Sequence, residues 1–194
     1  MDRPQALHTH AADNLQFIRE AMSRAGQFTA IPGWGGVIMG ASAIATAAAA
    51  SRIADPSAWL ASWFGDAAFA VVVAAVTMSR KARRLELPMF AAPARRFAFA
   101  YLPPLASGGV LTAVFVGNGL SARLPGCWLL LYGASIAVAG TLSIRIVQVM
   151  GVLFMALGAA SFIAPPQYGD AFMAAGFGGL HIVFGLIIAR KHGG

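Results

Sequence analysis

Apolar positions follow one another in long stretches along this chain, without the alternation or one-sided periodicity typical of a soluble strand or helix. A helix needs about 20 consecutive apolar residues to cross the hydrocarbon core of a bilayer, which is roughly 30 Å thick. Six stretches approach this length, so the pattern predicts an all-α, polytopic membrane protein with six transmembrane helices. The predicted spans are residues 31–50, 59–78, 97–116, 124–140, 146–163 and 171–189, of which the fourth is the shortest.

A shorter stretch before the first span has a different pattern. Residues 13–25 place polar side chains on one side of a helix and apolar side chains on the other, with Asp13 as N-cap. This amphipathic helix is expected to lie on the inner leaflet or beneath the bundle, or to dock onto a cytoplasmic protein partner. Leu15, Ile18 and Met22 are the partner-docking candidates, because all three lie on the apolar face.

Composition supports a membrane protein and disfavours several other classes. The residue types AVILMFWYC make up 58% of the 194 residues and the charged types only 11%, whereas a soluble domain carries roughly 25% charged residues. The one cysteine, Cys127, excludes an internal disulfide framework and cysteine-rich metal sites. A haem is disfavoured as well, because a single mid-depth histidine cannot supply two histidine axial ligands. We therefore expect no metal site and no cofactor.

The basic residues predict the orientation in the membrane. With the N-terminus in the cytoplasm, all of the 14 lysines and arginines except Arg52 and Arg123 fall in cytoplasmic segments. This positive-inside bias explains the net charge of +7 without a nucleic-acid partner. It predicts a cytoplasmic segment at residues 1–30, a six-helix bundle at 31–189 and a cytoplasmic tail at 190–194. The aromatic residues expected at the outer membrane interface are Trp59, Trp63, Trp128 and Tyr168.

Two short strings recur in the first and fourth spans at one constant offset. Pro-Gly at 32–33 and Gly-Ala-Ser at 40–42 reappear at 125–126 and 133–135. A duplication with three spans in each half would give a 3+3 inverted repeat, the arrangement of many secondary transporters. The alternative is a chance match, because the chain contains 22 glycines and many alanines.

Proline and glycine also mark the third and sixth spans. Pro103 and Pro104 remove two successive backbone donors from the third span, and residues 107–109 read Ser-Gly-Gly. Residues 176–179 of the sixth span read Gly-Phe-Gly-Gly and include Gly178. Interrupted helices at matching positions of two halves predict a midplane binding site. The alternative is that these residues serve kinks and close helix packing.

Asp66 and His181 are the only acidic, basic or histidine side chains within the six predicted spans. An ionised group near the bilayer centre costs at least about 2.5–3.5 kcal/mol, so each needs a buried partner, water or a neutral state. His181 is either a neutral histidine bonded to a serine, a tyrosine or a freed carbonyl, or else a proton relay or ligand contact. Asp66 lies nearer the outer end of its span and can reach headgroups or an outward-facing cavity.

Gly133, Ala134 and Ser135 in the fourth span, together with His181 in the sixth, resemble the serine and histidine of rhomboid intramembrane proteases, which also have six core spans. The resemblance implies Ser135 as nucleophile and His181 as its base. The family has glycine after the serine, where this chain has Ile136, and the second span here lacks the family's histidine and asparagine. As a whole the chain resembles bacterial multi-pass inner-membrane proteins, which implies a location but no mechanism.

Three hypotheses for the function remain. The first is a non-enzymatic sensor, regulator or assembly subunit of the inner membrane that acts through partners. The alternative is a small, proton-coupled transporter with a midplane site near His181 and Asp66. The remote alternative is a rhomboid-like serine hydrolase. The expected partners are the lipid bilayer, a protein that binds the N-terminal helix, and a second copy of the chain in a homo-oligomer, but no nucleic acid.

Overall fold

Six long helices make up the part of the chain that the structure, a computed structural model, describes, namely residues 27–86 and 92–192. All six are long and apolar enough to cross a membrane, and no strand occurs among the described residues. This confirms the all-helical fold, and the six helices indicate a multi-pass membrane protein. The helices are α2 (Gly33–Ala50), α3 (Pro56–Arg84), α4 (Ala92–Gly117), α5 (Leu124–Gly140), α6 (Arg145–Ile163) and a sixth made of α7 (Gly169–Met173), the π-helix η3 (Ala174–Leu180) and α8 (His181–His192).

Local sequence signals set the helix ends, which in α3 lie outside the predicted span. The Asp55 side chain caps α3 by accepting the N–H of Ala58 at 2.9 Å, and Pro56 takes the first helical position. α3 then continues beyond residue 78 through a basic turn to Arg84, because positive side chains stabilise the C-terminus of a helix. The amphipathic helix predicted at 13–25, with Leu15, Ile18 and Met22 on its apolar face, lies outside the described residues.

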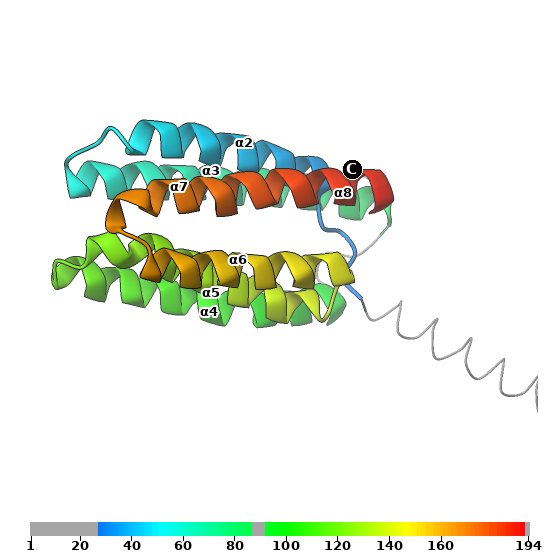
Figure 1. Cartoon of the computed structure of the whole chain (residues 1–194). Coiled ribbons are helices and arrows are strands. Elements are labelled where there is room, and N and C mark those ends of the chain that lie inside the picture. The colour runs from blue at the N-terminus through cyan, green and yellow to red at the C-terminus, as the bar shows by residue number, and fades with distance from the viewer. Residues whose placement is uncertain (1–26, 87–91, 193–194) are drawn as a thin grey trace, which may run out of the picture.

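The six helices form two groups of three that run alongside each other (Figure 1). The first group holds α2, α3 and the sixth helix, and α2 packs against both of the others. The second group holds α4, α5 and α6, and here α5 is the helix packed against both neighbours. We call the end of the bundle where α2 begins and α8 ends the basic end, and the opposite end the tryptophan end (Figure 1). Basic residues at the basic end are Arg80, Lys81, Arg83, Arg84, Arg95, Arg96, Arg145, Arg190 and Lys191, and Trp59, Trp63 and Trp128 lie at the tryptophan end.

Glycines bring one pair of helices in each group into backbone contact. A Cβ atom added at Gly133 of α5 would lie 2.7 Å from the amide nitrogen of Met155 and 2.8 Å from the carbonyl oxygen of Gly151, both in α6. A Cβ atom added at Gly40 of α2 would lie 2.6 Å from the carbonyl oxygen of Gly178 in η3. Such close packing drives helix association in lipid, where burial of apolar surface contributes little. Gly40 and Gly133 match in the sequence repeat, yet one faces the last helix and the other faces α6.

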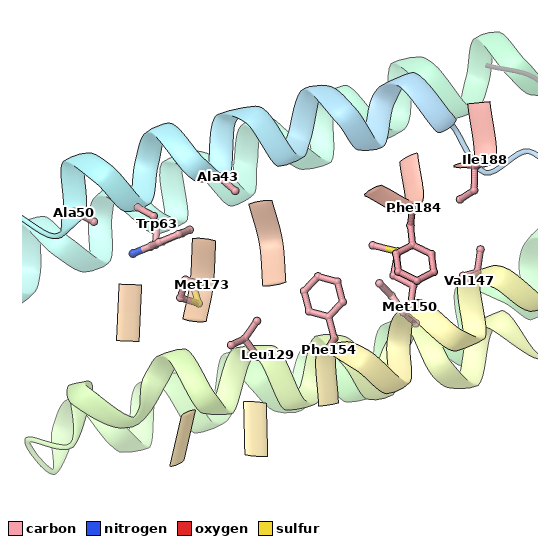
Figure 2. Close-up of a cluster of buried hydrophobic side chains, with 12 residues drawn as sticks. Ala43, Ala50, Trp63, Leu129, Val147, Met150, Phe154, Met173, Phe184 and Ile188 are labelled. Atoms are coloured by element: carbon pink, nitrogen blue, oxygen red, sulfur yellow. The ribbon is translucent and has the colours of Figure 1, made fainter. Parts of the chain in front are cut away.

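Large side chains fill the space between the two groups (Figure 2). Trp63 of α3, Leu129 of α5 and Phe154 of α6 are only 4%, 0% and 0% exposed and point into this space. The core of the protein therefore lies between the groups. On the outer faces, in contrast, large apolar side chains such as Val71 and Phe99 are 66% and 71% exposed. Lipid, rather than water, is the suitable surrounding for these faces.

The third and sixth helices differ in how they accommodate proline and glycine. α4 runs without a break through Pro103 and Pro104, so the interruption predicted for the third span is wrong. A helix that lipid surrounds must keep its backbone groups paired, and this favours a continuous helix over an unwound one. The sixth helix is irregular, because the π-helix η3 includes residues 176–179 and with them Gly178.

Residues 27–32, which we call the strap, join the two groups at the basic end. The backbone N–H of Phe28 donates to the carbonyl oxygen of Leu142 at 2.8 Å, and the Ser143 hydroxyl donates to the carbonyl oxygen of Phe28 at 2.6 Å. These two partners form the turn between α5 and α6 in the second group. On the other side, the Lys81 ammonium of α3 donates to a strap carbonyl at 2.9 Å. The strap therefore bonds to one helix end of each group.

Gly133→Ala is expected to destabilise the protein, because backbone atoms of Met155 and Gly151 leave no room for a Cβ atom. Overpacking of this kind costs about 1–3 kcal/mol. The matched control is Gly109→Ala in α4, where an added Cβ atom meets nothing within 4 Å. The control should be neutral or stabilise by up to about 1 kcal/mol, through better helix propensity. Thermal unfolding midpoints of the two variants in detergent measure the difference, and equal midpoints would contradict the glycine contact.

Candidate functional site

A tyrosine–histidine pair lies near the middle of the sixth helix, between the two groups. The hydroxyl oxygen of Tyr132 in α5 lies 2.7 Å from Nε2 of His181. Nδ1 of His181 lies 2.9 Å from the carbonyl oxygen of Phe177, which can only accept, so Nδ1 carries a proton. In the neutral imidazole, Nε2 then accepts the hydrogen bond that Tyr132 donates. His181 is 7% exposed, and both of its ring nitrogens have partners inside the protein.

Aromatic rings enclose this pair. The His181 ring stacks on Phe177 with centroids 6.2 Å apart and planes 15° apart, and it meets Phe154 edge-on at 5.4 Å. The Tyr132 ring contacts both phenylalanines, with centroids 4.9 Å apart in each case. Phe177 precedes His181 by about one turn, so the π-helix supplies both a ring and a carbonyl oxygen to the imidazole. In such an apolar surrounding a hydrogen bond is strong and an unpaired polar group is costly.

Further rings lead from the pair to the strap. Tyr101 of α4 meets Tyr132 edge-on, with centroids 6.2 Å apart. Phe97, one turn earlier in α4, stacks on Tyr101 at 6.1 Å, and Phe28 of the strap lies 4.9 Å from Phe97. A continuous row of contacting rings therefore joins the basic end of the bundle to its centre. The sequence analysis did not find this row, because its members come from the strap, α4 and α5, whose adjacency the pattern does not reveal.

Ser135, the nucleophile that the rhomboid resemblance implies, is fully buried in α5. Its hydroxyl oxygen has no hydrogen-bond partner among the described residues. The nitrogens of His181 bond instead to Tyr132 and to the Phe177 carbonyl. The hydrogen bond that a serine–histidine dyad requires is therefore absent between these two described side chains.

The other predicted site residues lie apart from the hydrogen bonds of the pair. Asp66 in α3 is half-buried and forms no hydrogen bond or ion pair with any described residue. Pro103 is exposed on α4 and Pro104 is half-buried. Gly178 lies against α2, where an added Cβ atom would lie 2.5 Å from a side-chain carbon. None of these four residues bonds to His181, so the structure does not join them into one hydrogen-bonded site.

A second polar cluster, which the sequence analysis missed, lies at the tryptophan end. The indole N–H groups of Trp59 and Trp63 both donate to Oδ1 of Asp170, at 2.9 and 3.2 Å. Trp128 stacks on Trp59 with centroids 5.7 Å apart and planes 12° apart. These tryptophans lie at one end of the bundle, as expected of interfacial residues, and there they pack between helices. The sequence did contain one indication of this cluster, because Trp59 and Trp63 stand four residues apart and therefore share one helical face.

Neither similarity to known proteins nor the described metal-binding side-chain types constrain the function further. No known protein family, curated protein or solved structure matches the chain. Within residues 27–86 and 92–192, no group of three or more His, Cys, Asp or Glu side chains could hold a metal ion. The function has to be argued from the geometry of the side chains themselves.

Tyr132→Phe is expected to lower the free energy of unfolding by about 1–3 kcal/mol, because Nε2 of His181 loses its donor and stays buried. Ser135→Ala on the same helix is the control. It should be neutral or stabilising, since it removes a buried hydroxyl that has no partner among the described residues. Thermal unfolding in detergent compares the variants. A Tyr132→Phe protein as stable as the parent would show that this hydrogen bond contributes nothing to the fold.

Proposed function

We propose that the protein is a non-enzymatic, multi-pass protein of the bacterial inner membrane that acts through protein partners as a sensor, regulator or assembly subunit. The main support is the state of His181, whose two ring nitrogens are both bonded within the protein and whose side chain is 7% exposed. A catalytic base or a substrate ligand needs a nitrogen that can reach the reacting molecule. The two ends of the bundle are then the surfaces where the protein meets other molecules.

The charges at the two ends support cytoplasmic termini. The basic end, where α2 begins and α8 ends, carries most of the described lysines and arginines. At the tryptophan end, Arg52 donates to the carbonyl oxygen of Ala48 at 2.6 Å and Arg123 donates to that of Phe162 at 2.9 Å. These two arginines therefore satisfy helix-end carbonyls. By the positive-inside rule the basic end faces the cytoplasm.

The strap supports a partner at the basic end. It follows directly on the part of the chain that holds the predicted docking helix at 13–25, so the strap is the described segment nearest to that helix in the sequence. An open pocket of about 460 Å³ adjoins the strap, and polar side chains can offer a partner hydrogen bonds there. The polar residues that line it are Gln27, Thr141, Ser143, Arg145, Gln148 and His192.

The orientation is testable with single cysteines in a Cys127→Ser background. A membrane-impermeant maleimide added to intact cells should label Tyr168→Cys at the tryptophan end, where the native side chain is 51% exposed. Arg83→Cys at the basic end should react only after the cells are opened, because that end faces the cytoplasm. Labelling of Arg83→Cys in intact cells would reverse the proposed orientation.

The partner proposal is testable by co-purification from the native membrane. Deletion of residues 1–26 should remove the co-purifying proteins while the bundle still inserts, because the six helices lie beyond that segment. A triple change of the apolar face, Leu15→Ser with Ile18→Ser and Met22→Ser, should have the same effect. The matched control changes the polar face instead, by Gln16→Ala with Ser23→Ala. Equal co-purification by the deleted and parent proteins would contradict docking through this helix.

A small, proton-coupled transporter is a second candidate, and Asp66 is the observation that favours it. This carboxyl group lies within an apolar helix and has no hydrogen-bond or ion-pair partner among the described residues. It points to the same side of α3 as Trp59, and so toward the bundle rather than the lipid. An unpaired acidic group inside a membrane helix marks an ion pathway in many transporters. The 3+3 inverted repeat and a homo-oligomer stay predictions alongside it.

Whether water reaches Asp66 distinguishes the transporter from a protein that acts only through partners. A transporter needs an aqueous path to Asp66, so a hydrophilic maleimide should label Asp66→Cys in the Cys127→Ser background. Ala67→Cys is the matched control, since residue 67 is exposed on the outer side of α3 and would face lipid. If Asp66→Cys resists labelling in membranes from both sides, no aqueous path reaches this residue and the transporter candidate fails.

A further inference from the structure

The cluster at the tryptophan end is more than a packing contact between helices. Asp170 lies at the start of the sixth helix, and its Oδ1 accepts both indole N–H groups, from Trp59 and Trp63. Oδ2 has no partner among the described residues. It is also not buried, because Ser135 Oγ is the one buried side-chain polar atom without a partner in the described part of the chain. One oxygen of this carboxylate therefore holds the tryptophans and the other reaches the surface.

The negative charge of Asp170 has no counter-ion among the described residues. The two arginines at this end, Arg52 and Arg123, donate to helix-end carbonyl oxygens instead. Two indole donors require only an acceptor oxygen, which a neutral asparagine would supply as well. The unpaired oxygen Oδ2, which reaches the surface, is therefore the atom that carries charge towards a partner from outside. The charge lies in the first turn of the sixth helix, where the helix dipole stabilises it, and it stays open to a cation that comes from outside the protein.

The aromatic rings around this carboxylate indicate which kind of cation would bind there. Trp59 and Trp128 are half-buried, and Phe64, tilted by 60° against Trp128 at 5.8 Å, is 51% exposed. Aromatic faces attract organic ammonium groups through the cation–π interaction. A hard metal ion instead needs several oxygen ligands, and the cluster offers only one carboxylate. The chemistry therefore matches a small organic ammonium group.

We propose that Asp170 together with Trp59, Trp63 and Trp128 forms a binding site for an organic ammonium group at the tryptophan end of the bundle. Oδ2 pairs with the positive charge, and the half-buried rings of Trp59 and Trp128 contact its carbon substituents, whereas the buried Trp63 holds the carboxylate in place. Tryptophans at this depth lie at the level of lipid headgroups, so the ammonium group belongs either to a headgroup such as phosphoethanolamine or to a free amine.

Tryptophan fluorescence can report on this site almost exclusively. The chain has four tryptophans, and Trp34 lies at the basic end, so Trp34→Phe leaves only the cluster to emit. The variant is placed in vesicles of phosphatidylglycerol alone and titrated with ethanolamine, with sodium chloride of equal ionic strength as the blank. In a second arm, phosphatidylethanolamine replaces increasing fractions of the phosphatidylglycerol. A saturable change of emission is expected in at least one arm. A response to the lipid alone identifies a headgroup, and a response to ethanolamine identifies a free amine.

Asp170→Asn separates binding from packing, because asparagine keeps an oxygen that accepts both indole N–H groups but has no charge. It is expected to weaken the apparent affinity at least tenfold in the responding arm. Asp55→Asn, a helix cap at the same end, should leave the affinity unchanged. If Asp170→Asn does not fold, Trp128→Leu takes its place and should weaken binding severalfold. The proposal is overturned if neither arm saturates, or if the folded variant responds like the parent.

Discussion

Backbone contact at glycines is the constraint on which the rest of the bundle depends. Helices in lipid gain little from burying apolar surface, so they associate where small residues let their backbones touch. Gly133 and Gly151 provide this contact between α5 and α6, and Gly40 and Gly178 provide it between α2 and the sixth helix. The large side chains are then left for the outer faces and for the space between the two groups. One helix pair in each group is therefore held by backbone contact, whereas α3, α4 and the two groups as a whole are held by side chains and a few polar links.

The contacts that join the two groups of helices lie at three depths of the bundle. At the basic end the strap bonds to the turn between α5 and α6 and to the end of α3. At the centre Tyr132 of the second group bonds to His181 of the first. At the tryptophan end Trp59 bonds to Asp170 and stacks on Trp128 of the second group. A displacement of one group against the other must alter these contacts, and the row of rings that starts at Phe28 connects the strap to the centre.

The sequence predicted what depends on composition and length, and it missed what depends on which helices are neighbours. All six spans correspond to helices, because a run of apolar residues long enough to cross a bilayer leaves few other structures. The partner types proposed for a neutral His181, a tyrosine or a carbonyl, also match the geometry. The identity of Tyr132 as that partner was not predictable, since every face of α5 is apolar. For the same reason the hydrogen bonds by which Asp170 holds Trp59 and Trp63 between helices were not predictable, although both tryptophans lie at a helix end as expected.

The polar groups of the described helices differ in whether they have partners and in whether they are sealed from the outside. His181, at mid-depth, has its full set of partners, and this is how a fold keeps a polar group in an apolar interior. Ser135 has no partner but is sealed by packing, so no molecule from outside can reach its hydroxyl. Asp66 and Asp170 differ from both, because each combines a carboxylate oxygen without a partner among the described residues with a position that is not sealed. In a chain where charged residues make up only 11% of the positions, a carboxylate oxygen of this kind stays open to a molecule from outside the protein.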